Sequence, residues 1–465
     1  VYYYTLGHSY SRSAAFFANG TYSYQGKYNL NGTIRYEGSN MLGRSRSARW
    51  LPTWNLSGSW NMHEEKFFDI FRPTLSHFTL KASYSLTADR GPASITNSTS
   101  IFSAYNPYRP FSTDKESGIA LYQTGNDELT YEKKHEWNFG VDAGFLNNRI
   151  NVTLDVYRRN NYDLIGVVNT QGVNRSAMSY GNVASMKSHG EELSISTTNI
   201  KNKDFSWTTN FIYSHAVNEV TELMSRANTM DYISGSGFAM TGYPVRALFS
   251  IPFVGLNENG YPMFINEKGN VTTTEINFQE RDNNSYLKYE GPTDPVYTGS
   301  LGNIFTYKGF RLNIFLTYSF GNVVRLDPVF SYKYNDLSSM TKEFKNRWMM
   351  PGDEKITNVP VILSKREYND NYELHYGYNA YNYSTERVAK GDFIRMKEIS
   401  FGYDFPSKWF KGMALNSLSV KLQGTDLFLI YADKKLNGQD PEFFRAGGVS
   451  APMPKQFTLT VKAGF

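Results

Sequence analysis

The sequence predicts an all-β fold, an antiparallel transmembrane β-barrel, from an unusual composition, a period-2 alternation and a regular pattern of connections. Of the 465 residues, 16% are aromatic, with 35 Tyr, 32 Phe and 7 Trp, yet the mean hydropathy is −0.49. A barrel wall has this composition because outward apolar residues alternate with polar lumen residues, and aromatic girdles mark both membrane interfaces. No run approaches the roughly 20 apolar residues that a spanning helix needs.

Charge and cysteine content exclude several other classes of protein. The 48 Lys and Arg against 43 Asp and Glu give a net charge of +5, which is spread along the chain without a basic stripe, so no nucleic-acid partner is expected. The chain has no cysteine, which removes disulfides, thiol catalysis and cysteine metal sites. No linker divides it, and residues 1–465 are therefore expected to form one barrel domain.

Period-2 alternation is clearest in residues 310–320, where Phe310, Leu312, Ile314 and Leu316 share one face. Residues 137–145, 150–156 and 457–465 show the same pattern. On the opposite faces lie polar residues that we expect to line the lumen or to contact a plug, since burying them dry and unpaired would be costly. These residues are Asn138, Asp142, Thr153, Asp155 and Asn313.

The connections between the predicted strands alternate between short and long. We predict thirteen strands near 13–24, 27–37, 52–62, 75–88, 135–146, 149–168, 183–199, 205–219, 297–307, 310–324, 392–405, 417–430 and 457–465. Short connections fall at 25–26, 147–148, near 202–203 and at 308–309, with two longer ones on the same side at 63–74 and 406–416. The opposite side carries 38–51, 89–134, 169–182, 220–296, 325–391 and 431–456. Transmembrane barrels have this asymmetry of tight periplasmic turns and long extracellular loops.

An odd number of strands predicts an incomplete wall. Bacterial single-chain barrels have even counts with both ends in the periplasm, and an open sheet would leave two unpaired edges. The chain also opens without a signal peptide, at Val1. We therefore expect further strands from upstream sequence or from another chain.

Several ordered stretches resemble the C-terminal barrel of SusC/RagA-type TonB-dependent outer-membrane transporters. They are 127–134 followed by 137–142, then 145–150, 181–193, 392–406, 438–442 and 452–459, and together the matches cover roughly residues 20–465. Small departures occur at Asp127, where the family often has Asn-Pro, and at Glu191–Glu192, which replaces the commoner Val-Glu.

The resemblance implies a 22-stranded barrel with an N-terminal plug, in the outer membrane of a Gram-negative bacterium. It also implies import of oligosaccharides or peptides, energy supplied through TonB, and a SusD-like lipoprotein over the extracellular mouth. The plug, the TonB-contacting segment and the signal peptide cannot be pointed to in this sequence. Cargo identity and oligomeric state are likewise beyond the sequence.

Aromatic residues in the long loops are the candidates for contact with cargo or with the lipoprotein lid. Exposed rings provide a large contact area at a low cost in side-chain entropy, although packing within the loops is the simpler role for them. The candidates are Trp348, Tyr372, Tyr376, Tyr378, Tyr381, Tyr383, Phe443 and Phe444.

The last strand carries a candidate assembly signal. Its alternating apolar residues Phe457, Leu459 and Val461, and the final Phe465, match the pattern by which outer-membrane proteins are recognised by the barrel-assembly machinery. The same residues also suit a lipid-facing position, and the two roles are compatible.

Catalytic and metal motifs are weak, and no enzyme activity is expected. His63-Glu-Glu lacks the second histidine of a zinc-protease helix, and we expect residues 63–74 to form a short amphipathic segment with Phe67, Phe68 and Ile70. The triplets that begin at Asp282 and Asn369 are rich in oxygen ligands, so Ca²⁺ binding stays an alternative there. Neither triplet has EF-hand spacing. No other cofactor is expected. The remaining alternatives are a passive, adhesive or secretory barrel, and a soluble all-β glycan-binding protein or glycosidase.

Overall fold

The computed structural model describes residues 10–91, 100–108, 116–123, 125–169, 178–224, 227–329, 340–412, 414–444 and 454–465. Within these ranges no helix is both long enough and apolar enough to cross a membrane. By their internal contacts the residues fall into two compact units. Unit 1 contains 1–147, 153–191 and 218–225, and unit 2 contains 148–152, 192–217 and 226–465.

Among the described residues, thirteen strands form one antiparallel sheet, as the sequence predicted. Their order is β1-β2-β3-β4-β7-β8-β9-β10-β16-β17-β20-β21-β22, so sequence neighbours pair throughout and β1 and β22 stand at the edges. The strands are β1 Ser13–Tyr24, β2 Tyr28–Ser39, β3 Trp50–Asn61, β4 Leu75–Asp89, β7 Glu132–Phe145, β8 Ile150–Asn169, β9 Met178–Lys201, β10 Phe205–Leu223, β16 Tyr297–Tyr307, β17 Phe310–Phe320, β20 Phe393–Asp404, β21 Ser417–Ala432 and β22 Gln456–Gly464.

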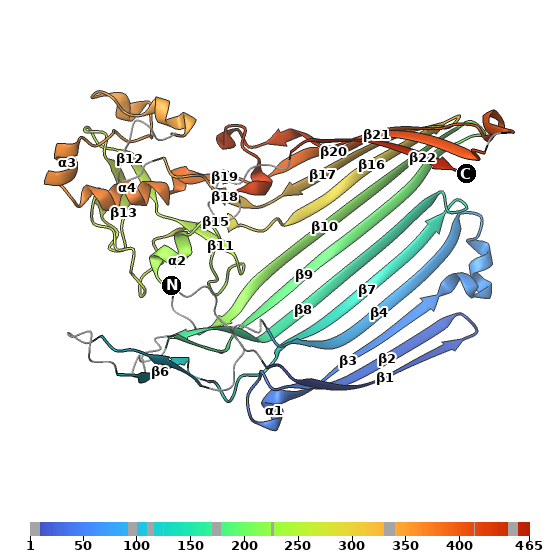
Figure 1. The fold of residues 1–465 in the computed structure, drawn as a ribbon, viewed down its shortest axis with the longest axis horizontal. Helices are drawn as coiled ribbons and strands as arrows, with labels where there is room; N and C mark the ends of the chain where they lie inside the picture. The colour runs from blue at the N-terminus through green and yellow to red at the C-terminus, as the bar shows by residue number, and fades with distance from the viewer. Residues whose placement is uncertain are drawn as a thin grey trace. The chain divides into compact units, whose positions relative to one another are not determined.

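In unit 1, β1 to β4 and β7 run side by side (Figure 1). One face of these strands carries a row of rings: Trp54 lies edge-on to Tyr84 at 5.0 Å, and Tyr84 stacks on Trp137 at 4.0 Å between ring centroids. The pairing Tyr84↔Trp137 and Ser83↔Asn138 places the aromatic and polar residues on opposite faces. This is the alternation expected of a wall with one apolar face.

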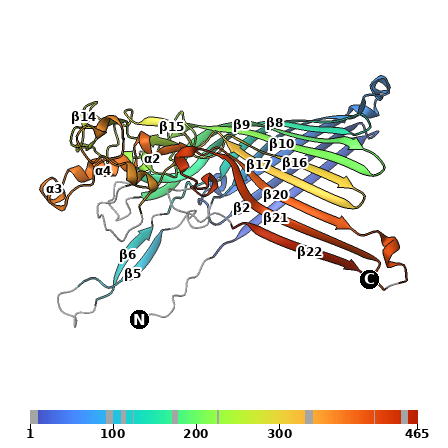
Figure 2. The same ribbon diagram turned by 90° about the horizontal axis from the view of Figure 1, so that it is seen from above.

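In unit 2, β16, β17, β20, β21 and β22 follow one another, with α3 and α4 at the end of these strands opposite the C-terminus (Figure 2). Apolar residues meet across neighbouring strands on one face, as in the row Leu312↔Phe401, Phe401↔Leu422 and Leu422↔Leu459. Polar residues share the other face, as in the pairing Asn313↔Ser400.

Tight turns close one end of the hairpins because their residues adopt positive φ. Gln25 and Gly26 have φ of 53° and 71°, and Lys308 and Gly309 have φ of 47° and 90°. Two successive positive-φ residues are typical of the two-residue type I′ turn, whose twist matches the strands it joins. The wider connection at 62–74 forms two short 3₁₀ turns, Met62–Glu64 and Lys66–Ile70. Phe68 is buried there, whereas Phe67 and Ile70 are exposed.

The strand predicted for 310–324 ends earlier. Gly321 has a φ of 87°, which breaks the extended backbone after Phe320. The next residues form β18 (Val323–Arg325), which pairs with β19 (Val388–Lys390) in a separate two-stranded sheet. The chain therefore leaves the large sheet at Gly321 and enters the loop region.

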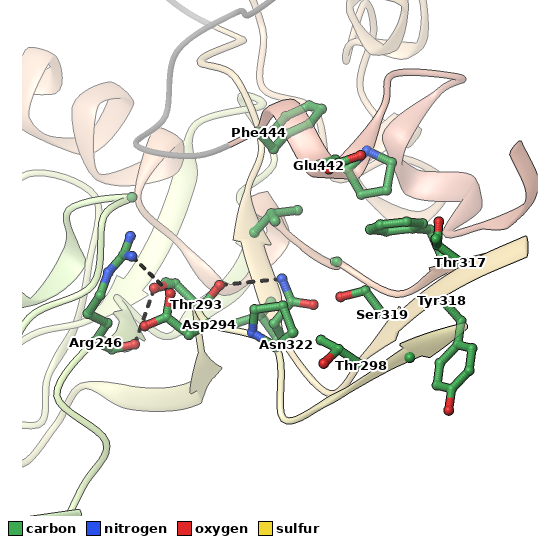
Figure 3. Close-up of a pocket in the computed structure, with 18 of the residues that line it drawn as sticks. Arg246, Thr293, Asp294, Thr298, Thr317, Tyr318, Ser319, Asn322, Glu442 and Phe444 are labelled. Carbon is green, nitrogen blue, oxygen red and sulfur yellow. Dashed lines mark hydrogen bonds and ion pairs between the residues drawn. The ribbon is translucent and has the colours of Figure 1, made fainter. Parts of the chain in front are cut away.

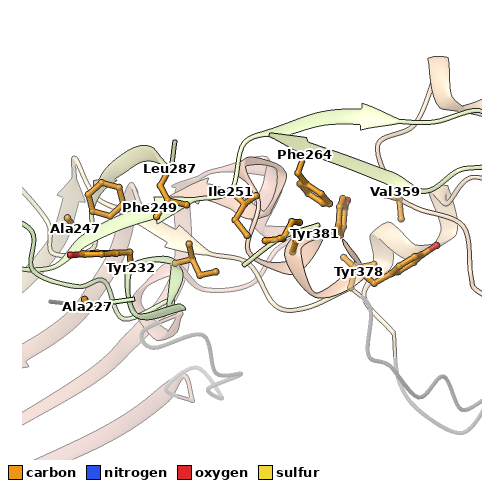
Figure 4. Packing of buried hydrophobic residues seen from close by; sticks show 14 of the residues in the cluster. Ala227, Tyr232, Ala247, Phe249, Ile251, Phe264, Leu287, Val359, Tyr378 and Tyr381 are labelled. Carbon is orange, nitrogen blue, oxygen red and sulfur yellow. The ribbon is translucent and has the colours of Figure 1, made fainter. Parts of the chain in front are cut away.

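The long connections contain folded structure that the strand pattern did not predict. Their elements are α1 Arg46–Arg49, β5 Ile101–Tyr105, β6 Gly118–Gln123, α2 Thr229–Ile233, β11 Ala247–Ser250, β12 Phe253–Leu256, β13 Pro262–Ile265, β14 Val271–Thr272, β15 Lys288–Pro292, α3 Lys365–Asp370 and α4 Leu374–Asn382. Residues from 227–289, Val329 and residues from 340–383 form an apolar cluster that we call the loop core (Figure 4). Ile233, Ile251 and Phe264 have no exposed surface in it, and Tyr381 retains 1%.

Candidate functional site

A cavity of about 320 Å³ lies where β16, β17 and β20 meet the loops of unit 2 (Figure 3). Thr298, Thr317, Ser319 and Phe393 line it from the strands. The pairings Thr298↔Ser319 and Ser319↔Phe393 place these residues on the polar face of the sheet. The cavity therefore opens from the face that lines the lumen of a barrel.

Asn322 lines this cavity and holds a buried, unsatisfied hydrogen-bond acceptor. Its side-chain nitrogen Nδ2 donates to the carbonyl oxygen of Thr293 at 3.4 Å, which fixes the amide orientation. Its side-chain oxygen Oδ1 is buried and has no hydrogen-bond partner among the described residues. The amide rests against Gly391, where a Cβ atom would come within 2.2 Å of Nδ2. A buried oxygen left unpaired costs free energy that a ligand N–H or O–H would recover.

Charged groups on the cavity lining already have ion-pair partners. Arg246 and Asp294, both partly exposed, form an ion pair at 2.8 Å. Lys397 is held by Asp426 at 2.6 Å. Because these charges already have partners, the groups left to meet a ligand are hydroxyls, the Asn322 amide and apolar surface.

The last long loop is fixed to β20 by a buried arginine. Arg395 is 4% exposed and donates from Nη2 to both carboxylate oxygens of Asp440, at 2.5 and 2.6 Å, with Glu442 at 3.2 Å. This anchor brings Glu442 and Phe444 to the cavity lining. Buried charges of this kind are stable only when paired, so the anchor sets the position of the loop.

A second buried arginine ties the loop core together. Arg325, 3% exposed, donates to the carbonyl oxygens of Ser384, Phe249 and Ile233 at 2.8, 2.6 and 3.3 Å. Burial lowers the pKa of Arg325 to about 9, and Glu290 opposes this shift, so the guanidinium stays charged at neutral pH. Arg325 thus joins the segment that contains Ile233 and Phe249 to Ser384, much further along the chain.

The predicted ring cluster divides into buried and exposed members. Tyr378 and Tyr381 are 8% and 1% exposed and pack in the loop core, with Tyr383 packed against it. Burial raises the pKa of both buried phenols. Tyr378 and Tyr381 therefore have the packing role within the loops that the sequence left open for them. Contact of these two residues with cargo or a lid stays a prediction.

Tyr372 and Tyr376 are the exposed members, at 61% and 43%. Tyr372 stacks on His375 at 5.2 Å, and burial lowers the pKa of that histidine. Met349, Met350 and Ile356, from 340–356 in the same unit, expose 64%, 63% and 83% of their surface. Contact of Tyr372 and Tyr376 with a partner or with cargo stays a prediction.

The other predicted aromatic residues have mainly structural surroundings. Trp348 covers Gly260, and its indole nitrogen donates to Glu354 at 3.2 Å. Phe444 is 5% exposed on the cavity lining, whereas the side chain of Phe443 lies outside what the structure describes. A role of Trp348 and Phe444 in binding is untested.

Polar residues predicted to face the lumen pair within the wall. Asp142 forms an ion pair with Lys81, and Asn313 donates to Glu398 at 3.0 Å. Asn138 pairs with Ser83 across β4 and β7. Asp155 lies beside Gly140, where a Cβ would come within 2.7 Å of its Oδ1. Thr153 lies in β8 with Asp155.

On the last strand, Phe457, Leu459 and Val461 are 73%, 66% and 60% exposed on the apolar face, and Phe465 is 86% exposed. Recognition of this strand by the assembly machinery stays a prediction. Within the described ranges, no group of three or more His, Asp or Glu side chains is arranged to hold a metal ion. Calcium binding is untested.

Comparison with known proteins identifies the family. Residues 2–327 match the family described as TonB dependent receptor-like, beta-barrel. TonB-dependent receptor P39 of Formosa agariphila is 25% identical over 94% of this chain and 44% of its own length. TonB-dependent receptor SusC of Bacteroides thetaiotaomicron is 26% identical over 89% of this chain and 40% of its own length.

The solved structure of the RagAB peptide transporter has the same fold, with a TM-score of 0.78 at 20% identity, over 98% of this chain and 48% of that one. This chain thus spans less than half the length of the relatives it matches. The expected resemblance is confirmed: the chain belongs to the TonB-dependent receptor β-barrel family, is of the SusC/RagA type, and forms part of an outer-membrane β-barrel.

Proposed function

We propose that this chain supplies wall strands and extracellular loops to an active importer of oligosaccharides or peptides. Cargo passes the cavity at Asn322, and a SusD-like lipoprotein covers the loops. Energy comes through TonB, and a plug and further strands complete the barrel. Relatives carry the names of receptors and transporters rather than enzymes, and the solved relative is titled a peptide transporter.

The observation that carries the proposal is the buried, unpaired oxygen of Asn322, a residue that lines a cavity together with hydroxyl groups. A passive pore needs no unsatisfied buried acceptor on its wall, whereas a binding site gains selectivity from such groups. Sugar hydroxyls and peptide N–H groups can both donate to this oxygen. The supporting geometry is therefore consistent with either class of cargo.

The test uses the full-length transporter with its partner and two probes, a mixture of oligosaccharides and a mixture of peptides, in binding and uptake assays. Asn322→Leu removes the acceptor at similar volume, and binding of one probe class should fall by about tenfold, the effect of losing a hydrogen bond in a buried site. Asn369→Leu, an exposed amide in α3, is the matched control and should bind normally.

Energy-independent passage of both probes in the unaltered protein would favour a passive barrel and overturn the proposal. Equal binding by Asn322→Leu and Asn369→Leu would remove the cavity from the cargo path.

The lipoprotein partner has a test of its own. Replacing both Tyr372 and Tyr376 by Ala should lower co-purification of the lipoprotein, because exposed rings contribute most to such contacts. Tyr108→Ala, which removes a ring that is 92% exposed elsewhere, is the control. An unchanged yield of the complex in the double variant would place the docking surface outside these rings.

A further inference from the structure

The apolar face of β8 ends at a charged residue. Ile150, Val152, Leu154 and Val156 occupy one face from the tight turn upward, with Leu154 and Val156 being 36% and 41% exposed, and Arg158 follows on the same face. Eight residues span about 26 Å along a strand, or about 20 Å along the membrane normal at a tilt of about 40°. The apolar band of a barrel is about 25 Å tall. Arg158 therefore lies near the outer interface.

Next to Arg158 is a cavity of about 590 Å³ formed by three strands of unit 1. Trp137 and Phe139 from β7 form one side of it, with parallel rings 6.3 Å apart and exposures of 47% and 56%. Lys187, Ser188, His189 and Glu191 from β9 form the other side, with Val156 to Arg158 of β8 between them. The cavity thus has an apolar half and a charged half.

Arg158 supplies the uncompensated charge of this cavity. Among the described residues, none forms an ion pair or a hydrogen bond with its guanidinium, whereas Lys187 is paired with Glu219 at 3.0 Å. Glu191 also has an interaction partner, so it is not a free charge on this lining. A charged side chain facing lipid is costly near the midplane and costs little at the interface, where a headgroup can meet it.

We propose that this cavity binds the phosphorylated headgroup of an outer-leaflet glycolipid. The Arg158 guanidinium donates two parallel hydrogen bonds to one phosphate, a geometry that suits its planar fork. An acyl chain lies along Trp137, Phe139 and Val156. A single phosphate fits better than a cluster because Glu219 already neutralises Lys187. The outer leaflet follows from the side of the long loops, which face outward in this family.

The experiment is native mass spectrometry of the full-length transporter with its partner, in detergent, titrated with monophosphorylated lipid A. Dephosphorylated lipid A and phosphatidylethanolamine are titrated in parallel. Arg158→Gln should weaken the binding of monophosphorylated lipid A by about tenfold, as expected for losing one charge-assisted arginine–phosphate pair. Arg366→Gln removes the same charge from an exposed site in α3 and should bind the lipid normally. Phe139→Ser should weaken binding of both forms of lipid A.

Three results would overturn the proposal. One is equal affinity of Arg158→Gln and Arg366→Gln for monophosphorylated lipid A. Another is equal binding of the dephosphorylated form by the unaltered protein. The third is binding of phosphatidylethanolamine as tight as that of lipid A, which would assign the site to any phospholipid. Arg158→Gln leaves the lumen face unchanged. Cargo uptake by this variant therefore tests the proposed transport path independently of the lipid site.

Discussion

The loop core and β22, both in unit 2, differ in how far their apolar side chains are buried. In the loop core, Ile251 and Phe264 are fully buried by other parts of the loops. On β22, Phe457 and Leu459 remain 73% and 66% exposed although they pair in register with β21. Both regions are rich in apolar residues, so composition alone does not separate them.

The difference concerns where the free energy of folding comes from. The loop core excludes water from apolar surface within the chain, as a soluble domain does. The apolar face of β22 gains that energy only when lipid covers it, because its own chain covers little of it. The two regions are therefore expected to lose stability under different substitutions and conditions.

The largest expected effect is that of Phe264→Ala in the loop core. Removing this buried ring should cost about 3–5 kcal/mol, from lost burial and the cavity left behind. Hydrogen exchange of the full-length protein should show faster exchange in β12 and β13, while the resistance of the barrel to unfolding in detergent stays the same. Val254→Ala, at a side chain that is 49% exposed in β12, should change neither measurement. Loosening of the large sheet by Phe264→Ala would contradict an independently folded loop core.

Sequence patterns identified the strand region but not the loop core, for a physical reason. A strand reveals itself locally, since residues such as Phe310 and Leu312 repeat every two positions on one apolar face. The loop core contains Ile233, Phe264 and Tyr381, which are separated by up to about 150 residues and belong to no common sequence periodicity. Local patterns therefore left both roles open for the tyrosines of that region, and the burial of Tyr381 shows only in the structure.

The candidate site was also beyond local patterns. Asn322 and Gly391 meet because β18 pairs with β19, an interaction across more than 60 residues. The local signal in the sequence is Gly321, since glycine after an alternating run often ends a strand. In the structure Gly321 has a positive φ. Arg158 was not singled out from the sequence, because the cavity beside it is formed by neighbouring strands.

A smaller effect is expected from charge on the apolar face of β22. Leu459→Arg should cost about 2–4 kcal/mol, the range for a cation on the lipid face of a barrel. Thr458→Arg places the same charge on the polar face, where Thr458 pairs with Gln423, and should cost much less. The fraction of protein that migrates as folded barrel in unheated gels measures both. Equal losses in the two variants would mean that β22 has no preferred lipid face.

The smallest expected effect is acid loosening of α3, at the edge of the loop core. The Glu367 carboxylate accepts hydrogen bonds from the backbone N–H of Ser364 at 3.1 Å and from the Tyr261 hydroxyl at 2.9 Å. The pKa of Glu367 is held below its usual value, first by a hydrogen bond with the Ser364 side chain and then by these two bonds. Its contribution is therefore complete above the unfolded pKa of about 4.3 and is lost as pH falls through the lower folded pKa.

We expect this contribution to be about 0.5–1 kcal/mol, the lower part of the range for a hydrogen bond, because solvent reaches the carboxylate. Hydrogen exchange of α3, measured as pH is lowered below 5, should speed up while β22 is unaffected. Tyr261→Phe removes one of these hydrogen bonds and should move the loosening to higher pH, since the folded pKa of Glu367 then rises toward its usual value. A pH response that is identical in the Tyr261→Phe variant would show that another carboxylate controls this edge of the loop core.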